Sequence, residues 1–365
     1  MNDSSVQFDG VSKRYTHFSL ENIHLDLPTG SIMGFIGANG AGKSTTMRIL
    51  MGLVHQDEGS VRVLGHPMPA DQAAAKLDIG FVSEDMRLYG AATLAWHMNF
   101  MRPIYPRWDQ PYADKLAQRF DLKPQQKIKG LSHGQRVKAA HGMNYSMVKS
   151  LILKDWYFQR TAILLSLAGG VLSLGIVAFG GQPGFTLGLI LLVTIMVMLS
   201  AMSVMGNTIG ERENQTLAFV MSLPVSHLEY TSAKILVNLL IFIPFWVILV
   251  AGSLALVVIS PVIHGLFAYT VIMSVEILAG ICLMIAVALV TESKGWTISA
   301  MVVGNLAINI VGYLVAHIPG ISNGMFGTVI QWRPAASFTL ATEFALIALL
   351  LGGAYFIQSR KKDFL

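Results

Sequence analysis

The chain has 365 residues, of which 53% are hydrophobic and 13% charged, and its formal net charge is +5. This length suffices for two domains, and the mild charge without a long basic run argues against nucleic acid as the main partner. Positions 1–142 hold 16 Lys/Arg and 13 Asp/Glu, whereas the longer segment 143–365 holds only 10 and 8. The second segment is too poor in charge for an ordinary solvated globule. A single cysteine, Cys282, excludes an intrachain disulfide.

The first segments predict strands. In ENIHLDL, residues 21–27, the side chains of Ile23, Leu25 and Leu27 share one face, as in a half-buried strand. The segment Ser31–Gly37, SIMGFIG, is a continuous apolar run, which is typical of a buried strand. We therefore expect a sheet ahead of the glycine-rich segment that follows.

That segment, GANGAGKS at residues 37–44, matches the pattern G-x-x-x-x-G-K-[ST]. In such a loop the glycines let backbone N–H groups surround phosphates, Lys43 brings a cation to the terminal phosphates, and Ser44 offers a hydroxyl to Mg²⁺. The next residues, STTMRILMGL, predict a helix whose N-terminus favours anions. The alternative, a chance glycine-rich turn, is disfavoured by the strand before and the helix after. The predicted nucleotide-binding residues here are Gly37, Ala38, Asn39, Gly40, Ala41, Gly42, Lys43, Ser44 and Thr45.

The run GANGAGKSTTMRILMGL, with Tyr15 upstream and LSHGQ downstream, resembles the nucleotide-binding domain of ABC transporters over about residues 5–141. The resemblance implies ATP and Mg²⁺ as cofactors. It also implies that Tyr15 stacks on adenine; a core tyrosine is the alternative. Glu84, in IGFVSED, stands where the family has the glutamine of its Q-loop. Its carboxylate suits Mg²⁺ or a water bound to the ion, and a solvated loop acid is the alternative.

The segment LSHGQ resembles the family signature LSGGQ, with histidine replacing a glycine. In the family this motif acts across a dimer, where it contacts the γ-phosphate bound by the partner's Walker A loop. The alternative is a simple helix N-cap at Ser132. The signature residues are Leu131, Ser132, His133, Gly134 and Gln135.

The family's Walker B motif, a buried strand ending in Asp-Glu, has no match after residue 135. Its nearest counterpart, LILKD at Leu151–Asp155, is interrupted by Lys154, and His141 lies too close to the signature to be the family's switch histidine. From Met143 the sequence resembles the opening of a separate permease. We interpret the chain as an in-frame fusion that removed the end of the ATPase. The strand beside Ser31–Gly37 would then be missing, which would leave backbone groups unpaired and apolar residues uncovered.

Six apolar stretches follow, each long enough to cross a hydrocarbon core of roughly 30 Å. They are about 161–179, 185–205, 235–259, 267–290, 297–316 and 338–357. The predicted fold is thus an α/β P-loop NTPase, a partial ABC ATPase domain at 1–142, followed by an all-α membrane domain with six transmembrane helices at 143–365. The resemblance of its loop at residues 207–234 implies that this second domain is a permease of ABC-2 type.

The basic residues of the second segment predict its orientation in a bilayer. With six spans, nine of its ten Lys/Arg fall on one side, which the positive-inside rule makes cytoplasmic, and only Arg333 falls opposite. We expect a multi-pass cell-membrane protein with both termini and the nucleotide-binding part in the cytoplasm.

Two polar features lie in this second segment. The loop Asn207–Lys234 resembles the cytoplasmic loop of ABC-2 permeases, in which a short helix docks on the nucleotide domain. Glu211, Arg212 and Glu213 are the expected polar contacts, and a solvated loop is the alternative. Glu276 is an acid near the middle of a span. Such a residue faces a pathway or a partner, for which Asn305 and Asn309 are candidates, or is protonated and purely structural. Glu343 is expected nearer a membrane interface.

Two functions remain open. The first is an exporter half that forms a homodimer, or a heterodimer with a complete ABC subunit, and couples ATP binding to the permease. The second is a non-hydrolysing nucleotide-binding membrane protein, a relic of a deletion or a regulatory subunit. The sequence does not select a transported substrate.

Overall fold

The computed structural model describes residues 4–82, 87–105, 107–130, 147–325 and 327–361. The chain divides into two compact units. The first unit comprises Met1–Leu151, Arg212–Tyr230 and Arg360–Leu365, and the second comprises Ile152–Glu211 and Thr231–Ser359. A segment from the middle of the sequence, Arg212–Tyr230, therefore belongs with the N-terminal residues.

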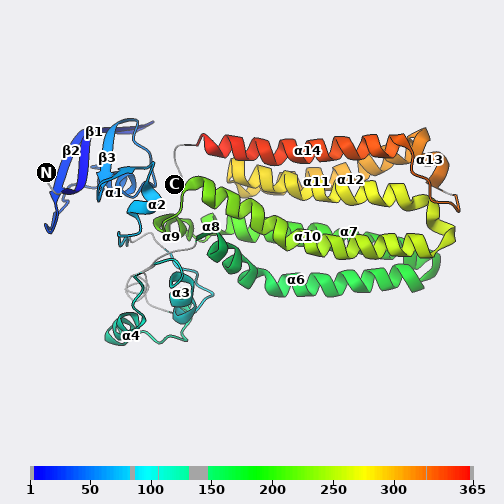
Figure 1. Ribbon diagram of the computed structural model, residues 1–365, viewed down its shortest axis with the longest axis horizontal. Coiled ribbons are helices and arrows are strands. Elements are labelled where there is room, and N and C mark those ends of the chain that lie inside the picture. Colours follow the sequence, from blue (N-terminus) through cyan, green and yellow to red (C-terminus); the bar gives the residue numbers. More distant parts are fainter. Residues whose placement is uncertain (1–3, 83–86, 106, 131–146, 326, 362–365) are drawn as a thin grey trace. The chain divides into compact units, whose positions relative to one another are not determined.

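The first unit is built on a four-stranded antiparallel sheet (Figure 1). Its strands, in the order β2-β1-β3-β4, are β1 (Ser4–Tyr15), β2 (Phe18–Pro28), β3 (Glu58–Val63) and β4 (His66–Met68). The alternation predicted for residues 21–27 is confirmed by β2, in which Ile23, Leu25 and Leu27 pack on the core. Buried Phe8 and Val61 are paired in the sheet, and Ile49 completes the core from a helix.

Short helices complete the first unit. They are α1 (Lys43–Leu50), α2 (Gln72–Ala75), α3 (Leu94–Met101), α4 (Gln110–Arg119), the 3-10 turn η1 (Ile128–Gly130) and α9 (Leu217–Ser222). Two of them start at side-chain caps. The Thr93 hydroxyl accepts a hydrogen bond from the N–H of Trp96 at α3, and the Asp109 carboxylate accepts one from the N–H of Tyr112 at α4. Such caps satisfy N–H groups that have no partner inside the helix.

The strand predicted at Ser31–Gly37 is wrong. These residues form no strand and are exposed, with Ile32 at 101% and Ile36 at 96% of full exposure. A β-strand is stable only when a neighbouring strand pairs with its backbone groups. Among the described residues, the sheet lies elsewhere and is wholly antiparallel. The apolar composition indicated burial, but none of the described strands lies beside these residues to cover them.

The second unit is helical. Its elements are α6 (Met147–Phe179), α7 (Gly181–Val204), the π-helical turn η2 (Met205–Ile209), α8 (Gly210–Glu213), α10 (His227–Ile259), η3 (Pro261–Leu266), α11 (Phe267–Thr291), α12 (Lys294–His317), α13 (Pro319–Met325) and α14 (Pro334–Ser359). Six segments of these helices are long and apolar enough to cross a membrane, which confirms the six predicted spans. They are Leu151–Phe179, Leu187–Glu213, Leu228–Ile259, Ile263–Thr291, Lys294–His317 and Pro334–Ser359.

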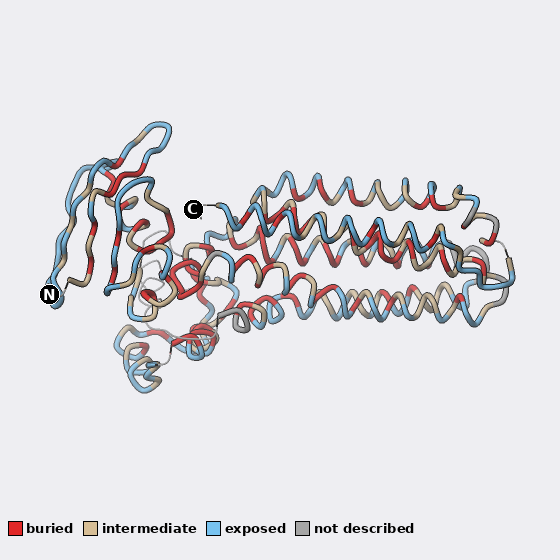
Figure 2. The backbone as a smooth tube through the Cα atoms, turned by 45° about the horizontal axis from the view of Figure 1, so that its top comes forward, coloured by how far each residue is buried: buried red, intermediate tan, exposed pale blue. Residues whose placement is uncertain are grey.

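Helix α11 is the central helix of this unit (Figure 1). It packs against α7, α12 and α14, and its residues Ile281, Ile285 and Leu289 join a core with Phe242 and Leu249 of α10. Figure 2 shows that the outer helices are exposed along much of their length. Their exposed side chains are largely apolar, for example Leu165, Phe338 and Leu349. Apolar residues all round a helix are typical of contact with lipid.

Candidate functional site

The glycine-rich loop forms a turn that glycine alone can make at its end. Gly42 precedes α1 with a φ of 90°, in the left-handed region. A Cβ atom at Gly42 would lie 2.7 Å from Leu20 Cδ1 and 3.1 Å from the Phe18 ring. Side chains of strand β2 thus pack directly against the loop at Gly42. The predicted helix after the loop is confirmed by α1, whose first N–H groups have no acceptor within the helix.

Lys43 is held by the loop itself. Its ammonium group donates hydrogen bonds to the main-chain carbonyls of Gly37, at 2.5 Å, and Ala38, at 2.8 Å. Behind it, the buried Thr46 hydroxyl donates to the carbonyl of Gly42 at 3.0 Å. The lysine therefore lies over the loop that the sequence assigns to phosphate, at the N-terminus of α1. A cation, exposed loop residues and a helix N-terminus at one place fit a nucleotide phosphate chain.

Tyr15 lies close to the residues of β2 that contact the glycine-rich loop. Its ring stacks on Phe18 with centroids 6.3 Å apart, and Phe18 is the residue that lies under Gly42. The side chain is 43% exposed, and the Lys13 ammonium lies 5.6 Å from the ring centre. This exposure excludes the core tyrosine that the sequence left open. An exposed ring next to the loop can stack on a base.

Several predicted residues lie outside the described residues. These are the candidate metal ligand Glu84 and the signature residues Leu131–Gln135. Of the predicted magnesium ligands, Ser44 is described, and it is exposed in the first turn of α1. Within the described ranges, no group of three or more His, Cys, Asp or Glu side chains could hold a metal ion. The loop therefore fits phosphate, and Ser44 is the one predicted magnesium ligand among the described residues.

The segment most similar to a Walker B strand is helical. Leu151–Asp155 lies in α6, and both Lys154 and Asp155 are buried there. The Asp155 carboxylate is paired with the ammonium groups of Lys154, at 2.8 Å, and Lys234, at 3.0 Å. Its charge is thus neutralised by two lysines within the second unit.

A second acid completes this buried ion cluster. Glu211 in α8 also contacts the ammonium groups of Lys154 and Lys234, the latter at 2.9 Å. Two lysines and two carboxylates, which we call the four-charge ring, thus join α6, α8 and α10. Among the described residues, the Glu211 carboxylate is buried and paired with these two lysines. Its expected contact with the nucleotide domain stays a prediction. A charge so deeply buried requires a paired and hydrogen-bonded environment.

The short helix predicted in the loop 207–234 is present as α9, and it is packed inside the first unit. Phe219 and Val220 are fully buried. The ring of Phe219 meets those of Tyr89 and His97 edge-on, with centroids 5.9 and 6.2 Å apart. The described contacts of α9 are therefore mainly apolar and aromatic.

One hydrogen bond fixes the end of α9. The Lys76 ammonium donates 2.8 Å to the main-chain carbonyl of Met221 and 2.7 Å to the side-chain oxygen of Gln72. Lys76 is fully buried, and this loss of hydration lowers its pKa to about 7. Sequence analysis missed Lys76, because a lysine after a run of alanines has the pattern of an exposed helix end.

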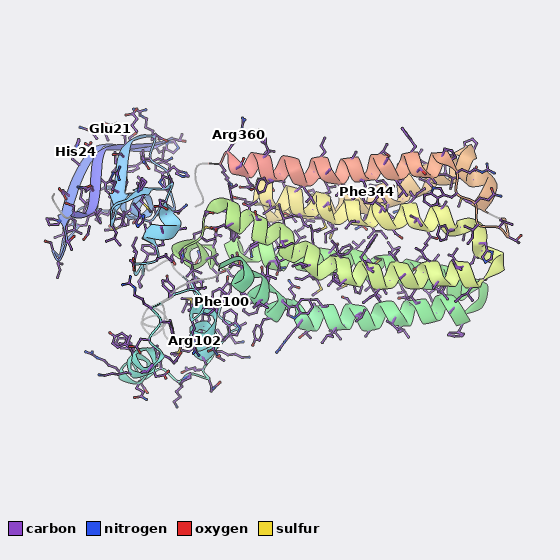
Figure 3. All side chains as sticks on the ribbon, viewed as in Figure 1. Glu21, His24, Phe100, Arg102, Phe344 and Arg360 are labelled. Carbon is purple, nitrogen blue, oxygen red and sulfur yellow. The ribbon has the colours of Figure 1, made fainter. Side chains whose placement is uncertain are left out.

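His97 of α3 is held as a neutral ring. Its Nδ1–H donates to the carbonyl of Thr93 at 2.9 Å, while Nε2 accepts from the N–H of Tyr89 at 3.2 Å. Burial lowers the pKa of His97 to about 4, although the bond to Thr93 opposes this shift. The neighbouring Phe100, labelled in Figure 3, is buried and stacks on Trp96 with centroids 5.2 Å apart. This aromatic group forms the surface on which α9 packs.

Comparison with known proteins agrees with the loop geometry. Residues 20–155 match the ABC transporter family. The sulfate/thiosulfate import ATP-binding protein CysA of Bacillus cereus is 30% identical over 161 residues, which are 41% of this chain and 45% of that protein. The daunorubicin resistance ATP-binding protein DrrA3 of Streptomyces coeruleorubidus is 33% identical over 127 residues, 33% of this chain and 40% of that protein. The ABC transporter ATP-binding protein YtrB of Bacillus subtilis is 27% identical over 141 residues, 37% of this chain and 46% of that protein.

A solved ATP-binding subunit of an ABC transporter is 22% identical, with a TM-score of 0.34, and the match covers 38% of this chain and 60% of that one. The chain spans less than half the length of the three curated relatives. The family match ends at residue 155, so it includes Leu151–Asp155. Residues 20–155 of this chain are therefore related to the ATP-binding domains of ABC transporters, and six candidate membrane helices accompany them.

Proposed function

We propose that the chain is an ABC-type membrane transporter subunit that binds ATP with Mg²⁺ at Gly37–Thr45 and couples this binding to a six-span permease of ABC-2 type. One observation carries the proposal. Helix α9, which lies between the second and third candidate spans in the sequence, packs within the nucleotide-binding unit through Phe219 and the Lys76–Met221 bond. Any motion of the nucleotide-binding unit that moves α9 is passed along the chain to both spans.

The binding step rests on Lys43 and the α1 N-terminus. A phosphate group would replace the carbonyls of Gly37 and Ala38 as the acceptors of the Lys43 ammonium. Tyr15 offers an exposed ring for the base, and Ser44 offers a hydroxyl for Mg²⁺. When bound, Mg²⁺ neutralises charge on the phosphates.

We further propose that the working state is a dimer, of two copies or with a complete ABC subunit, and that transport is outward. A dimer supports the role of the signature residues, which in the family act on the partner's nucleotide. Outward transport is supported by the resemblance to ABC-2 permeases and by the resistance function in the name of the DrrA3 relative. The CysA relative is named as an import protein, so the ATP-binding residues alone do not decide direction.

A second candidate is a nucleotide-binding subunit without hydrolysis. The pairing of Asp155 favours it, because this acid is buried among lysines and lies in a helix. In this case the chain would regulate, or depend on, a partner with intact catalytic acids.

The experiment for both candidates is nucleotide binding by the purified full-length chain, followed with a fluorescent ATP analogue and Mg²⁺. Lys43→Ala should weaken binding at least about tenfold, because a charge-assisted hydrogen bond contributes about 1.5–3 kcal/mol. Lys123→Ala, an exposed lysine outside the loop, is the matched control and should bind normally. Equal binding by Lys43→Ala and the parent chain would contradict the proposed site.

A further inference from the structure

Helices α11 and α14 each carry one acid inside an apolar span. Glu276 follows Phe267, the first residue of α11, by nine positions, and Glu343 follows Pro334, the first residue of α14, by nine positions. At 1.5 Å per residue, both acids lie about 14 Å along their helices. The helices begin at the same end, since η3 leads into α11, α13 precedes α14, and η3 contacts α13 (Figure 1). The two acids therefore lie at matching depth.

Both acids are turned into the packing between the helices. The exposed fraction is 7% for Glu276 and 6% for Glu343. On α14, Glu343 shares a buried face with Ala336, Ala354 and Gln358, and Gln358 donates a hydrogen bond to the carbonyl of Leu289 on α11. The Glu343 carboxyl group interacts electrostatically with that of Glu276. The expectation that Glu343 lies near a membrane interface is therefore wrong.

Within the described part of the chain, Glu343 has no counter-charge or hydrogen bond to stabilise an ionised carboxylate. Both carboxyl oxygens are buried, and neither has a hydrogen-bond partner among the described residues. Of the two amides that the sequence suggested as partners of Glu276, Asn309 donates from its side chain to the main-chain carbonyl of Asn305 in its own helix, at 2.9 Å.

The other ionisable groups of the surrounding elements lie more than one helical turn away in depth, counted along their helices. Neither α7, α13 nor η2 contains an ionisable residue. The groups on the remaining elements are Tyr269 and Cys282 of α11, His264 of η3, Lys294, Tyr313 and His317 of α12, Tyr355 of α14, and His227, Glu229, Tyr230 and Lys234 of α10.

We propose that Glu276 and Glu343 form a proton-binding site within the membrane-spanning unit. An ionised carboxylate is strongly disfavoured in such surroundings, and two facing carboxylates are disfavoured further by repulsion. A proton bound to either acid removes one of the two charges and with it the repulsion between them. No larger ligand fits in the packed state, because both carboxyl oxygens of Glu343 are buried. A metal cation would also require several more oxygen ligands.

This site goes beyond the proposed function and does not depend on nucleotide binding. Its consequence is a link between helix packing and proton release. If α14 separates from α11, water reaches the carboxyl group, which ionises to a carboxylate and releases its proton to that water. The two carboxylates then repel, so the packed arrangement of α11 and α14 returns only when a proton binds again.

The test uses the full-length chain in detergent and dicyclohexylcarbodiimide, an apolar reagent that adds to protonated carboxyl groups in apolar surroundings. Peptide mass spectrometry locates the adducts at about pH 6 and about pH 9. We expect Glu343 or Glu276 to be modified at least about tenfold more than exposed Glu21, and more at the lower pH. Modification at the level of Glu21 at both pH values would overturn the proposal.

Two variants distinguish an interacting pair of acids from a single buried acid. In Glu276→Gln, modification of Glu343 should decline at a lower pH than in the parent chain, because no neighbouring carboxylate opposes its ionisation. Glu21→Gln is the matched control and should change nothing. An unchanged pH dependence in Glu276→Gln, or protection of the parent chain by sodium ions, would overturn the proton pair.

A second measurement covers the case in which the variant does not fold. The infrared spectrum of the unmodified chain should contain a protonated-carboxyl band at about pH 8, where exposed carboxyl groups are ionised. Absence of that band would contradict the proposal without any substitution.

Discussion

The ammonium group of Lys76 donates a hydrogen bond of 2.8 Å to the main-chain carbonyl of Met221, 145 positions later in the chain. Met221 lies in the last turn of α9, where carbonyl groups have no acceptor role inside the helix. A cation at a helix C-terminus also interacts favourably with the helix dipole. Lys76 therefore provides the hydrogen-bond donor that the Met221 carbonyl lacks within the helix, and it fixes the end of α9, which leads to the third candidate span.

Replacing Lys76 by Met should loosen α9, because the substitution keeps the apolar stem and removes the donor. A hydrogen bond from a charged group contributes about 1.5–3 kcal/mol, so amide hydrogen exchange at 217–222 should accelerate at least about tenfold. Hydrogen exchange with mass spectrometry on the full chain measures this directly. The exposed Lys123→Met is the control. Equal protection of 217–222 in both variants would show that Phe219 alone holds the helix.

The contact should also depend on pH. The folded pKa of Lys76 is about 7, whereas that of an unfolded lysine is about 10.4. Between these values the unfolded state binds more protons, so the free energy of unfolding should rise as pH rises from about 7 to 10. Local exchange at 217–222, corrected for its intrinsic pH dependence, should slow over this range in the parent chain. It should show no such trend in Lys76→Met.

His97 should make the same region sensitive to acid. Its folded pKa of about 4 lies below the usual value of about 6.5, so between these values only the unfolded state takes up the proton. The free energy of unfolding should therefore fall by about 3 kcal/mol as pH decreases from about 6.5 to 4. Exchange at 89–101 should accelerate over this interval. His97→Gln should remove the trend, exposed His17→Gln should retain it, and a trend that persists in His97→Gln would exclude His97 as its source.

The four-charge ring should be sensitive to the loss of one acid. Glu211→Gln leaves the ammonium groups of Lys154 and Lys234 with Asp155 as their remaining acid in the ring. Removing one partner from a buried ion pair is destabilising by about 3–5 kcal/mol, so the thermal midpoint of the second unit should fall. The exposed acid Glu213, in the same helix, provides the control Glu213→Gln.

The double variant Glu211→Leu and Lys234→Met should recover much of the stability that Glu211→Gln loses. It leaves the ring electrically neutral, with Lys154 paired to Asp155 at 2.8 Å. Apolar replacements of buried ion pairs are often neutral or stabilising. A double variant as unstable as the sum of its single changes would show that the four groups do not act as one cluster.

These residues also indicate what a sequence can predict. The glycine-rich loop, α1 and the six spans were predicted because their patterns are local: fixed spacing in the first case and long apolar runs in the second. Ser31–Gly37 was predicted wrongly because a strand depends on a second strand, distant in the chain, that pairs with it. The sequence of the segment itself does not specify that partner. Lys76 was missed for the same reason, since it is buried and bonded to Met221, far away in the chain.

Glu343 was misplaced by a smaller error. The last span was predicted to begin near residue 338, which put Glu343 close to its end, whereas α14 begins at Pro334. Four further residues move the acid about 6 Å deeper along the helix. Helix boundaries are the least certain feature of a hydropathy pattern, and the depth of a polar residue depends directly on them.

The orientation predicted from the basic residues can be tested with single cysteines. Cys282 is buried, so the background is Cys282→Ala. Val329→Cys, at an exposed position between α13 and α14, should react with a membrane-impermeant maleimide in intact cells. Glu213→Cys, before α9, should react only after the cells are permeabilised. The reverse pattern would place the nucleotide-binding unit outside the cell and contradict the proposed orientation.

The purified chain should not hydrolyse ATP above background. Hydrolysis requires a positioned water and firmly held Mg²⁺ as well as a phosphate-binding loop. Asp155 belongs to the segment most similar to Walker B, but it is buried in α6 and paired with Lys154 and Lys234. It is therefore not available to position the water or to hold Mg²⁺. Loss of a water-orienting group alone lowers rates by about 10²–10⁴. A second copy of the chain would bring the same deficiency, whereas a complete ABC subunit would bring its own acids.

Phosphate release should therefore be measured with the chain alone and after mixing with such a subunit. We expect activity only in the mixture, above that of the added subunit by itself, and Lys43→Ala should reduce this gain. A clear rate from the chain alone, abolished by both Lys43→Ala and Asp155→Asn, would instead show that Asp155 leaves its lysine partners during the cycle and acts at the nucleotide. In that case the helical start of α6 would have to rearrange before each turnover, because a carboxylate between two ammonium groups is a poor base for activating water.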